Sequence, residues 1–182
     1  DLVNEDKPEG LEALRLFSEE EKDSVPQYSL IASFNEAAIR RSENDFYGAL
    51  DIYNEIINFA KKGKPIIGIC NGFQILCEAG LLPGTLRINK TQKFICKSVI
   101  IYRGYDKYNI PIAHAEGNYY HPNPAKVSIA YTYAEDVNGS MNYIAGIWHN
   151  NVLGMMPHPE RAFETYHCSQ DGIKILENFY GE

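Results

Sequence analysis

One stretch of the chain, residues 64–80 (KPIIGICNGFQILCEAG), restricts the possible folds more than any other. Residues 66–69 form a short apolar run, long enough for a strand that is buried on both faces. Residues 73–79 have the composition of a helix, and a glycine follows as its stop signal. Between the two lies Cys70, with a glycine two residues away on either side. The stretch therefore predicts a strand, a tight turn that carries a cysteine, and a helix.

The predicted turn suits a nucleophile. Small neighbours permit a strained backbone that holds the side chain clear of the sheet, as in the nucleophile elbow of hydrolases. The partial positive charge at a helix N-terminus favours a thiolate at Cys70. The backbone N–H of Asn71 would point to the place where an oxyanion forms. Cys70 is thus a candidate nucleophile, with a buried packing cysteine as the alternative.

A cysteine nucleophile needs a base, and the base needs an orienting group. Residues 155–161 read MMPHPER and supply both in His158 and Glu160. In an extended chain, side chains two residues apart leave the same face, so the carboxylate can hold the far nitrogen of the imidazole. Each motif alone is common in turns and cores, but the two in this order predict a catalytic triad of Cys70, His158 and Glu160.

These motifs resemble those of the triad glutamine amidotransferases. Five wider stretches make the chain similar to one family among them, the glutaminase subunits of phosphoribosylformylglycinamidine synthase: residues 71–76, 78–84, 111–120, 138–146 and 154–161. The resemblance begins at about residue 64. It implies that the Cys70 thiolate attacks the side-chain amide of glutamine, forms a thioester, and yields glutamate and ammonia for purine biosynthesis.

The resemblance also implies further site residues. The substrate-binding candidates are Asn71, Gln74, Asn142, Ile144 and Ala145, the last three through their backbone. A loop near the active site and the partner contact would contain His114, Glu116, Asn118 and Tyr119. Without the resemblance, His114 would be interpreted as a structural histidine. The remaining histidines have no metal-ligand spacing, so no metal site is expected.

The implied partners are glutamine, a synthetase subunit that consumes the ammonia, and a small accessory subunit of the same complex. The chain has neither a Walker-type loop nor a G-x-G-x-x-G motif. No cofactor is therefore expected in this chain, and ATP and Mg²⁺ are expected on the synthetase partner.

The first part of the sequence departs from the family's pattern. The family has a Gly-Ser/Thr-Asn-Cys segment and a Gly-Gly-Phe-Ser-Tyr-Gly-Asp loop whose backbone supplies a second oxyanion donor, and residues 1–48 contain neither. This region is divergent or incomplete relative to the family. Two alternatives stay open: an amidotransferase subunit for another acceptor, or a catalytically weakened interaction subunit of the same fold.

Composition limits the class of protein. The 182 residues are expected to form a single glutamine amidotransferase domain over residues 1–182. The net charge of −7 argues against a nucleic-acid or anionic-membrane partner. The chain shows no apolar run of membrane-spanning length, no secretory leader and no paired cysteines, so a cytoplasmic enzyme is expected.

The expected fold class is α/β, a mainly parallel sheet flanked by helices with an antiparallel excursion, as in the flavodoxin-like class I glutamine amidotransferases. Residues 49–62 predict a helix with an apolar face made by Leu50, Tyr53, Ile56, Ile57 and Ala60. Strands are expected at 28–32, 94–102, 110–114, 126–133, 142–148 and 152–156, with a polar turn at 105–109. Ser169 would cap a final helix with Ile173, Leu176, Phe179 and Tyr180 facing inward.

Overall fold

The computed structural model describes residues 44–164 and 166–181. The chain divides into two compact units, Asp1–Lys62 and Gly63–Glu182. The expected strand at 28–32 and the charged helical segment before it lie outside the described residues. None of the helices in the described ranges is long and apolar enough to cross a membrane.

In the first unit the structure describes helix α4 (Phe46–Lys61). It begins ahead of the predicted start because Asp45 caps it, its Oδ1 accepting a hydrogen bond from the Gly48 N–H at 3.0 Å. The side chains that the helix buries follow helical spacing: Ala49, Ile52, Ile56 and Ala60. Leu50, predicted on the apolar face, is instead 51% exposed, since it lies next to the true face rather than on it.

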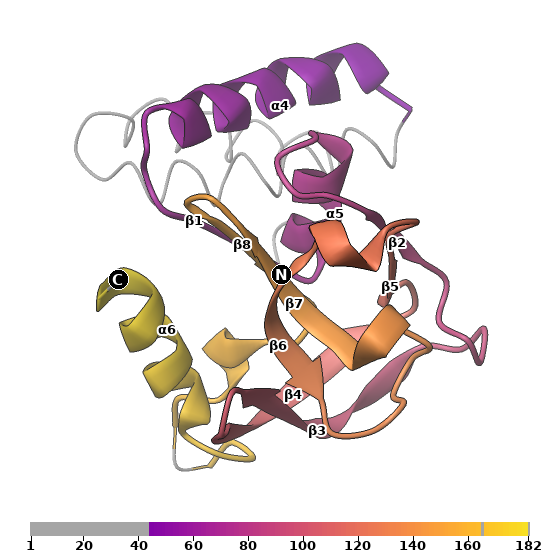
Figure 1. The fold of residues 1–182 in the computed structure, drawn as a ribbon, viewed down its shortest axis with the longest axis vertical. Helices are drawn as coiled ribbons and strands as arrows, with labels where there is room; N and C mark the ends of the chain where they lie inside the picture. The colour runs from indigo at the N-terminus through magenta and orange to yellow at the C-terminus, as the bar shows by residue number, and fades with distance from the viewer. Residues whose placement is uncertain (1–43, 165, 182) are drawn as a thin grey trace. The chain divides into compact units, whose positions relative to one another are not determined.

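The second unit is built on a six-stranded sheet with the strand order β1-β8-β7-β6-β3-β4 (Figure 1). The strands are β1 (Ile66–Ile69), β3 (Ile95–Arg103), β4 (Asp106–His114), β6 (Ser128–Tyr133), β7 (Ile144–His149) and β8 (Val152–Met155). Strands β1 and β8 run parallel, and the other neighbouring strands described in this sheet run antiparallel. The α/β class with a mixed sheet is confirmed, and the antiparallel part is larger than expected because the excursion supplies most of the described strands.

A second, two-stranded sheet pairs β2 (Thr85–Arg87) with β5 (Asn118–Tyr120). It was not predicted, because three residues are too few to show an alternating pattern. Short 3-10 helices complete the connections: η1 (Pro124–Lys126), η2 (Met141–Tyr143) and η3 (Pro159–Arg161).

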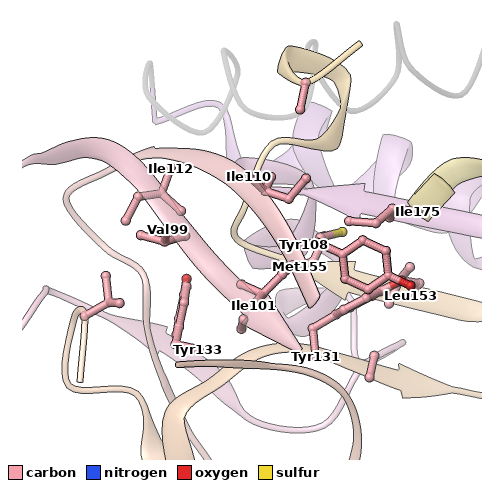
Figure 2. Close-up of a cluster of buried hydrophobic side chains, with 14 of the residues drawn as sticks. Val99, Ile101, Tyr108, Ile110, Ile112, Tyr131, Tyr133, Leu153, Met155 and Ile175 are labelled. Carbon is pink, nitrogen blue, oxygen red and sulfur yellow. The ribbon is translucent and has the colours of Figure 1, made fainter. Parts of the chain in front are cut away.

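Two helices cover opposite faces of the β1–β8 pair. Helix α5 (Asn71–Glu78) lies so close to β8 that a Cβ added to Gly154 would fall 2.2 Å from Phe73 Cδ2. Helix α6 (Asp171–Gly181) packs Ile175 and Phe179 into the buried cluster that also contains Leu153 and Met155 of β8. Successive residues of a strand point to opposite faces, so the two helices lie on different sides of the sheet. Figure 2 shows Ile175 in one buried cluster with side chains of β3, β4, β6 and β8.

The sheet curves until the ends of distant strands meet. Strands β1 and β4 lie at opposite ends of the strand order, yet the Cys70 thiol after β1 donates to the Ala113 carbonyl of β4 at 3.7 Å. The His158 N–H, after β8, donates to the Pro111 carbonyl of β4 at 2.8 Å. The C-terminal ends of β1, β8 and β4 therefore converge, and the candidate site lies where they meet.

Details of the β3–β4 hairpin and of β6 differ from expectation. Residues 105–109 were predicted as a turn, but β4 already begins at Asp106 and the turn is made by Gly104 (φ 60°) and Tyr105. Polar residues at an exposed hairpin end are compatible with a strand. The strand predicted at 126–133 begins only at Ser128 as β6, and a register shift between Ile129 and Tyr131 leaves Ile129 45% exposed.

One further strand boundary and part of the predicted inward face of α6 were wrong. The strand expected from Asn142 begins only at Ile144, because Asn142 (φ 51°) and Tyr143 (φ 57°) have left-handed backbone. In α6, Ile175 and Phe179 are buried, while Ile173 is 37% exposed and does not face inward. Ser169 does bond the start of α6, since its Oγ accepts a hydrogen bond from the Asp171 N–H at 3.2 Å.

Candidate active site

Cys70 lies at the predicted turn between β1 and α5. Its backbone is left-handed, with φ 52° and ψ −107°, a conformation that costs a non-glycine residue free energy and is concentrated at functional sites. The Cys70 N–H donates to the Met155 carbonyl at 2.8 Å, and its own carbonyl accepts from the Phe73 N–H at 3.0 Å. A Cβ on Gly68 would lie 2.7 Å from the Gly72 carbonyl carbon, so glycine is required for α5 to approach β1. The predicted strand, turn and helix are thus present.

His158 follows β8, the parallel neighbour of β1, and is 6% exposed. Its Nδ1 lies 2.6 Å from Glu160 Oε1. A carboxylate only accepts hydrogen bonds, so Nδ1 carries the proton and Nε2 is the nitrogen available as a base. The contact is made across the 3-10 turn η3 and not along the extended chain that the spacing suggested.

The surroundings of His158 favour its protonated form. Burial alone lowers the pKa of the imidazole, but the interactions with Cys70 and Glu160 outweigh burial and raise the pKa to about 9. Cys70 therefore contributes to the raised pKa of His158. In the resting geometry, however, the thiol donates to the Ala113 carbonyl, and His158 Nε2 has no hydrogen-bond partner. Catalytic hydrogen bonds often tighten only when substrate binds. The structure thus brings Cys70, His158 and Glu160 together.

The predicted substrate residues on α5 lie beside the cysteine. Gln74 Nε2 donates to the Glu116 carbonyl at 3.0 Å, which joins α5 to the 114–119 loop. Asn71 is exposed at the first position of α5, where backbone N–H groups have no partner within a helix. A backbone donor and a side-chain amide are therefore available on the same helix as the thiol.

The predicted backbone contacts on β7 are partly used inside the protein. The Ile144 N–H donates to the Met141 carbonyl, and the Ala145 carbonyl accepts from the Met156 N–H at 2.9 Å. Asn142 is exposed and left-handed. Of these three candidates, Asn142 is the one whose side chain is open to a ligand.

The predicted loop contains one buried histidine and one packing tyrosine. Burial and then the nearby His158 lower the pKa of His114 to about 4, so this imidazole is neutral. Tyr119 is buried, stacks on Phe73 and donates from its OH to the Pro83 carbonyl at 2.7 Å, so its side chain supports α5 instead of reaching a partner. Asn118 donates to the Ile88 carbonyl at 3.4 Å.

Sequence reasoning missed a buried polar network behind this loop. Its side chains are those of Asn89, Asn138 and Ser140. Asn89 lies outside every stretch that resembles the family, and Asn138 and Ser140 lie in the 138–146 stretch but were not predicted as site residues. Asn138 Nδ2 and Ser140 Oγ both donate to the Gly117 carbonyl, at 2.8 and 3.0 Å. Residues 136–140 have the composition of a turn, and the resemblance of residues 138–146 to the family was the signal that could have pointed to this network. Within the described ranges no three His, Cys, Asp or Glu side chains gather as a metal site.

Comparison with known proteins identifies the family to which the chain belongs. The profile of the CobB/CobQ-like glutamine amidotransferase domain matches residues 49–134. The chain is 45% identical over 150 residues to phosphoribosylformylglycinamidine synthase subunit PurQ of Pyrococcus horikoshii, covering 70% of this chain and 67% of that protein. The chain belongs to the PurQ family. The PurQ of Pyrococcus furiosus is 46% identical over 149 residues, covering 69% of this chain and 67% of the relative.

A solved structure agrees with the PurQ assignment. A chain of the PurLQS structure from Thermotoga maritima is 42% identical and superposes with a TM-score of 0.67, covering 71% of this chain and 67% of that one. PurQ is the glutaminase subunit of its synthase, so this agreement disfavours an amidotransferase for a different acceptor.

Proposed function

We propose that the chain is the glutaminase subunit of a phosphoribosylformylglycinamidine synthase, with Cys70, His158 and Glu160 as its catalytic residues. The observation that carries the assignment of these residues is the convergence of a strained cysteine with a buried, carboxylate-bound imidazole at the ends of β1 and β8. The reaction is the hydrolysis of glutamine to glutamate and ammonia.

In the first half of the reaction, the proton of the Cys70 thiol resides on His158, whose raised pKa favours the thiolate–imidazolium pair, and the thiolate sulfur attacks the side-chain amide carbon of glutamine. Glu160 holds Nδ1–H and stabilises the resulting imidazolium. The N–H of Asn71 donates to the oxyanion of the tetrahedral intermediate. His158 then gives its proton to the departing nitrogen, the C–N bond breaks, and ammonia leaves a glutamyl thioester on Cys70.

In the second half, neutral His158 takes a proton from a water molecule whose oxygen attacks the thioester carbon. The second tetrahedral intermediate collapses with cleavage of the C–S bond. The sulfur leaves as thiolate and regains its proton through His158, and glutamate is released. Gln74 and Asn142 are proposed to hold the substrate.

Ammonia released into bulk water becomes protonated and loses its nucleophilicity, so a glutaminase of this kind works against a partner that consumes ammonia. The solved relative comes from a PurLQS structure. We infer that this chain assembles with a synthetase subunit, and we propose that a small accessory subunit joins the same complex. ATP and Mg²⁺ would be bound by the synthetase partner in the cytosol.

Alkylation of the assembled complex with a glutamine-shaped electrophile tests the assignment of the nucleophile. Mass spectrometry is expected to find a single adduct, on the peptide that contains Cys70, and Cys70→Ala is expected to abolish both adduct and glutaminase activity. Cys77 is an internal control in the same peptide region, because burial, followed by the charge of Glu78, raises the pKa of its thiol to about 12.

The result that would overturn the assignment is an unlabelled Cys70 in a complex that still hydrolyses glutamine. A matched variant, Cys168→Ala, removes an exposed cysteine and is expected to leave both the adduct and the rate unchanged.

A further inference from the structure

The segment that contacts the nucleophile does so through backbone oxygens. The Ala113 carbonyl accepts the Cys70 thiol at 3.7 Å, and the Glu116 carbonyl accepts Gln74 Nε2 at 3.0 Å. The position of a carbonyl depends on the path of the chain and not on the identity of its side chain. Whatever fixes the path of residues 113–117 therefore fixes two contacts of the candidate site.

One buried side chain, that of Asn89, holds this path. Its Nδ2 donates to the carbonyls of Lys93 at 2.9 Å and His114 at 2.8 Å. Its Oδ1 accepts from the Gly117 N–H at 3.0 Å and lies 3.0 Å from His114 Nδ1. Its backbone N–H donates to the Ala115 carbonyl at 2.8 Å. An amide offers two donors and two acceptor lone pairs, so this side chain, 1% exposed, is saturated.

The same bonds fix the tautomer of His114. The two carbonyl partners of Nδ2 fix the orientation of the amide, so Oδ1 faces His114 and can only accept. Nδ1 of His114 must then carry the proton, and Nε2, buried without a partner, is unprotonated. The ring also lies against Gly117, where a Cβ would fall 2.3 Å from the ring carbon Cε1. An uncharged imidazole here avoids repelling the imidazolium of His158.

We propose that Asn89 is a positioning residue for the glutaminase reaction: it fixes the path of residues 113–117 and the tautomer of His114, and so orients the carbonyls that contact Cys70 and Gln74. The proposal rests on the proposed function of the same site and names a residue that acts on it through others. Loosening this segment would misplace the thiol and the glutamine-binding amide by fractions of an ångström.

The first test compares Asn89→Asp with Asn109→Ala in the assembled complex. The aspartate keeps the shape of the side chain but loses both donors. Asn109 lies on β4, as do Ala113 and His114, and its side chain donates to the Cys168 carbonyl at 3.3 Å without touching residues 113–117. We expect kcat/KM for glutamine to fall about 30- to 100-fold in Asn89→Asp and to stay within about 2-fold in the control.

Two alkylating agents separate positioning from a general loss of structure. Inactivation by a glutamine-shaped electrophile needs the whole site, whereas iodoacetamide needs only an accessible thiolate. In Asn89→Asp, labelling of Cys70 by the glutamine-shaped agent is expected to slow about as much as turnover. Labelling by iodoacetamide is expected to change less than about 3-fold. A parallel fall with both agents would overturn the proposal.

A pair of His114 variants keeps the proposal testable if Asn89→Asp does not assemble. In His114→Asn an amide N–H replaces Nδ1–H and can still bond Asn89, so activity is expected within about 5-fold of the parent. His114→Gln moves the amide away from that position and is expected to lose about as much as Asn89→Asp. Equal losses in both His114 variants, or an unchanged rate in a folded Asn89→Asp complex, would overturn the proposal. An inactive parent complex would instead defeat the proposed function.

Discussion

At the scale of single residues, the candidate site joins a strained backbone to a buried ionisable pair. Cys70 holds a left-handed conformation that other hydrogen bonds enforce, and His158 is buried but tied to a carboxylate that is itself 41% exposed. Removing one partner of such a pair leaves the charge of the other without compensation in a buried environment. Glu160 is therefore the residue at which the electrostatics of the site can be tested.

Replacing Glu160 with Gln is expected to lower the pKa of His158 from about 9 toward its ordinary value, because burial then meets less opposition. Because folding raises the pKa of His158, protonation of its imidazole stabilises the folded protein. This contribution is complete below pH 6.5, the ordinary pKa of the group, and is lost as the pH rises through about 9. The parent is thus expected to exceed the variant in unfolding free energy at about pH 6 and to equal it near pH 10.

The expected difference at pH 6 is on the order of 1 kcal/mol, reduced from the full shift because the carboxylate is partly solvated. Denaturant titrations at several pH values measure it. A difference that grows as the pH rises would contradict the assignment of the charged pair.

At the scale of elements, the contact between β1 and α5 positions the cysteine. A Cβ on Gly68 would collide with the Gly72 backbone at 2.7 Å, whereas a Cβ on Gly72 would meet no heavy atom within 4 Å. We expect Gly68→Ala to destabilise the protein by about 2–3 kcal/mol, since the helix must move away from the strand. Gly72→Ala is expected to be neutral or to stabilise by up to about 1 kcal/mol.

Chemical denaturation of both glycine variants makes this comparison. Similar stabilities for the two would show that α5 does not depend on the close approach to β1.

Helix α6 offers a second matched pair. Ile175 is fully buried at 0% exposure and Ile173 is 37% exposed. Ile175→Ala is expected to cost about 2–4 kcal/mol, because it leaves a cavity in the cluster drawn in Figure 2. Ile173→Ala is expected to cost about 0.5 kcal/mol or less. Thermal unfolding of both variants would reveal a reversed order if the opposite face of α6 were the packed one.

Local patterns in the sequence predicted the elements that local physics determines. The β1–Cys70–α5 turn was found because an apolar run and two glycines mark it, and strands β7 and β8 were found because apolar runs mark them. Helix α6 was found and its predicted inward residue Phe179 is buried, but Ile175 is buried in place of Ile173, since the two are equally apolar and only tertiary packing decides which is buried. The β2–β5 pair and the register shift in β6 carry no local signal.

The same limit applies to the site. His158 and Glu160 could be predicted as site residues because two residues of suitable chemistry stand at a suitable spacing, and the structure brings them into contact. Asn89 was missed, because its role comes from partners brought to it by the fold, namely Lys93, His114 and Gly117. The resemblance to known amidotransferases indicated the His114 loop but not what holds it in place.

At the scale of the second unit, curvature of the sheet makes the site. The His158 N–H bonds the Pro111 carbonyl at 2.8 Å and the Cys70 N–H bonds the Met155 carbonyl at 2.8 Å, so β4, β8 and the turn after β1 are tied together. Pro111 has no N–H to donate, and it lies on a strand at the edge of the sheet order, where proline is tolerated.

Hydrogen exchange is expected to report these ties as part of the cooperative core. The amides of Cys70 and His158 should exchange nearly as slowly as those of the buried strand residues Ile101 and Leu153, because opening either bond requires separating strands. Mass spectrometry of proteolytic peptides follows the exchange. Exchange more than about 100-fold faster at the two site amides would show that the site opens without the core.

The parallel pairing of β1 with β8 has a consequence for biosynthesis. Strand β1, which leads into the candidate nucleophile Cys70, gains its neighbour only after β8 (Val152–Met155) has been synthesised. His158 and its contact with Glu160 follow later still. A nascent chain that still lacks them has Cys70 without its candidate base, so it is not expected to hydrolyse glutamine. The order of the segments along the polypeptide is thus expected to delay ammonia production until β8 and His158 have been synthesised and have folded against β1.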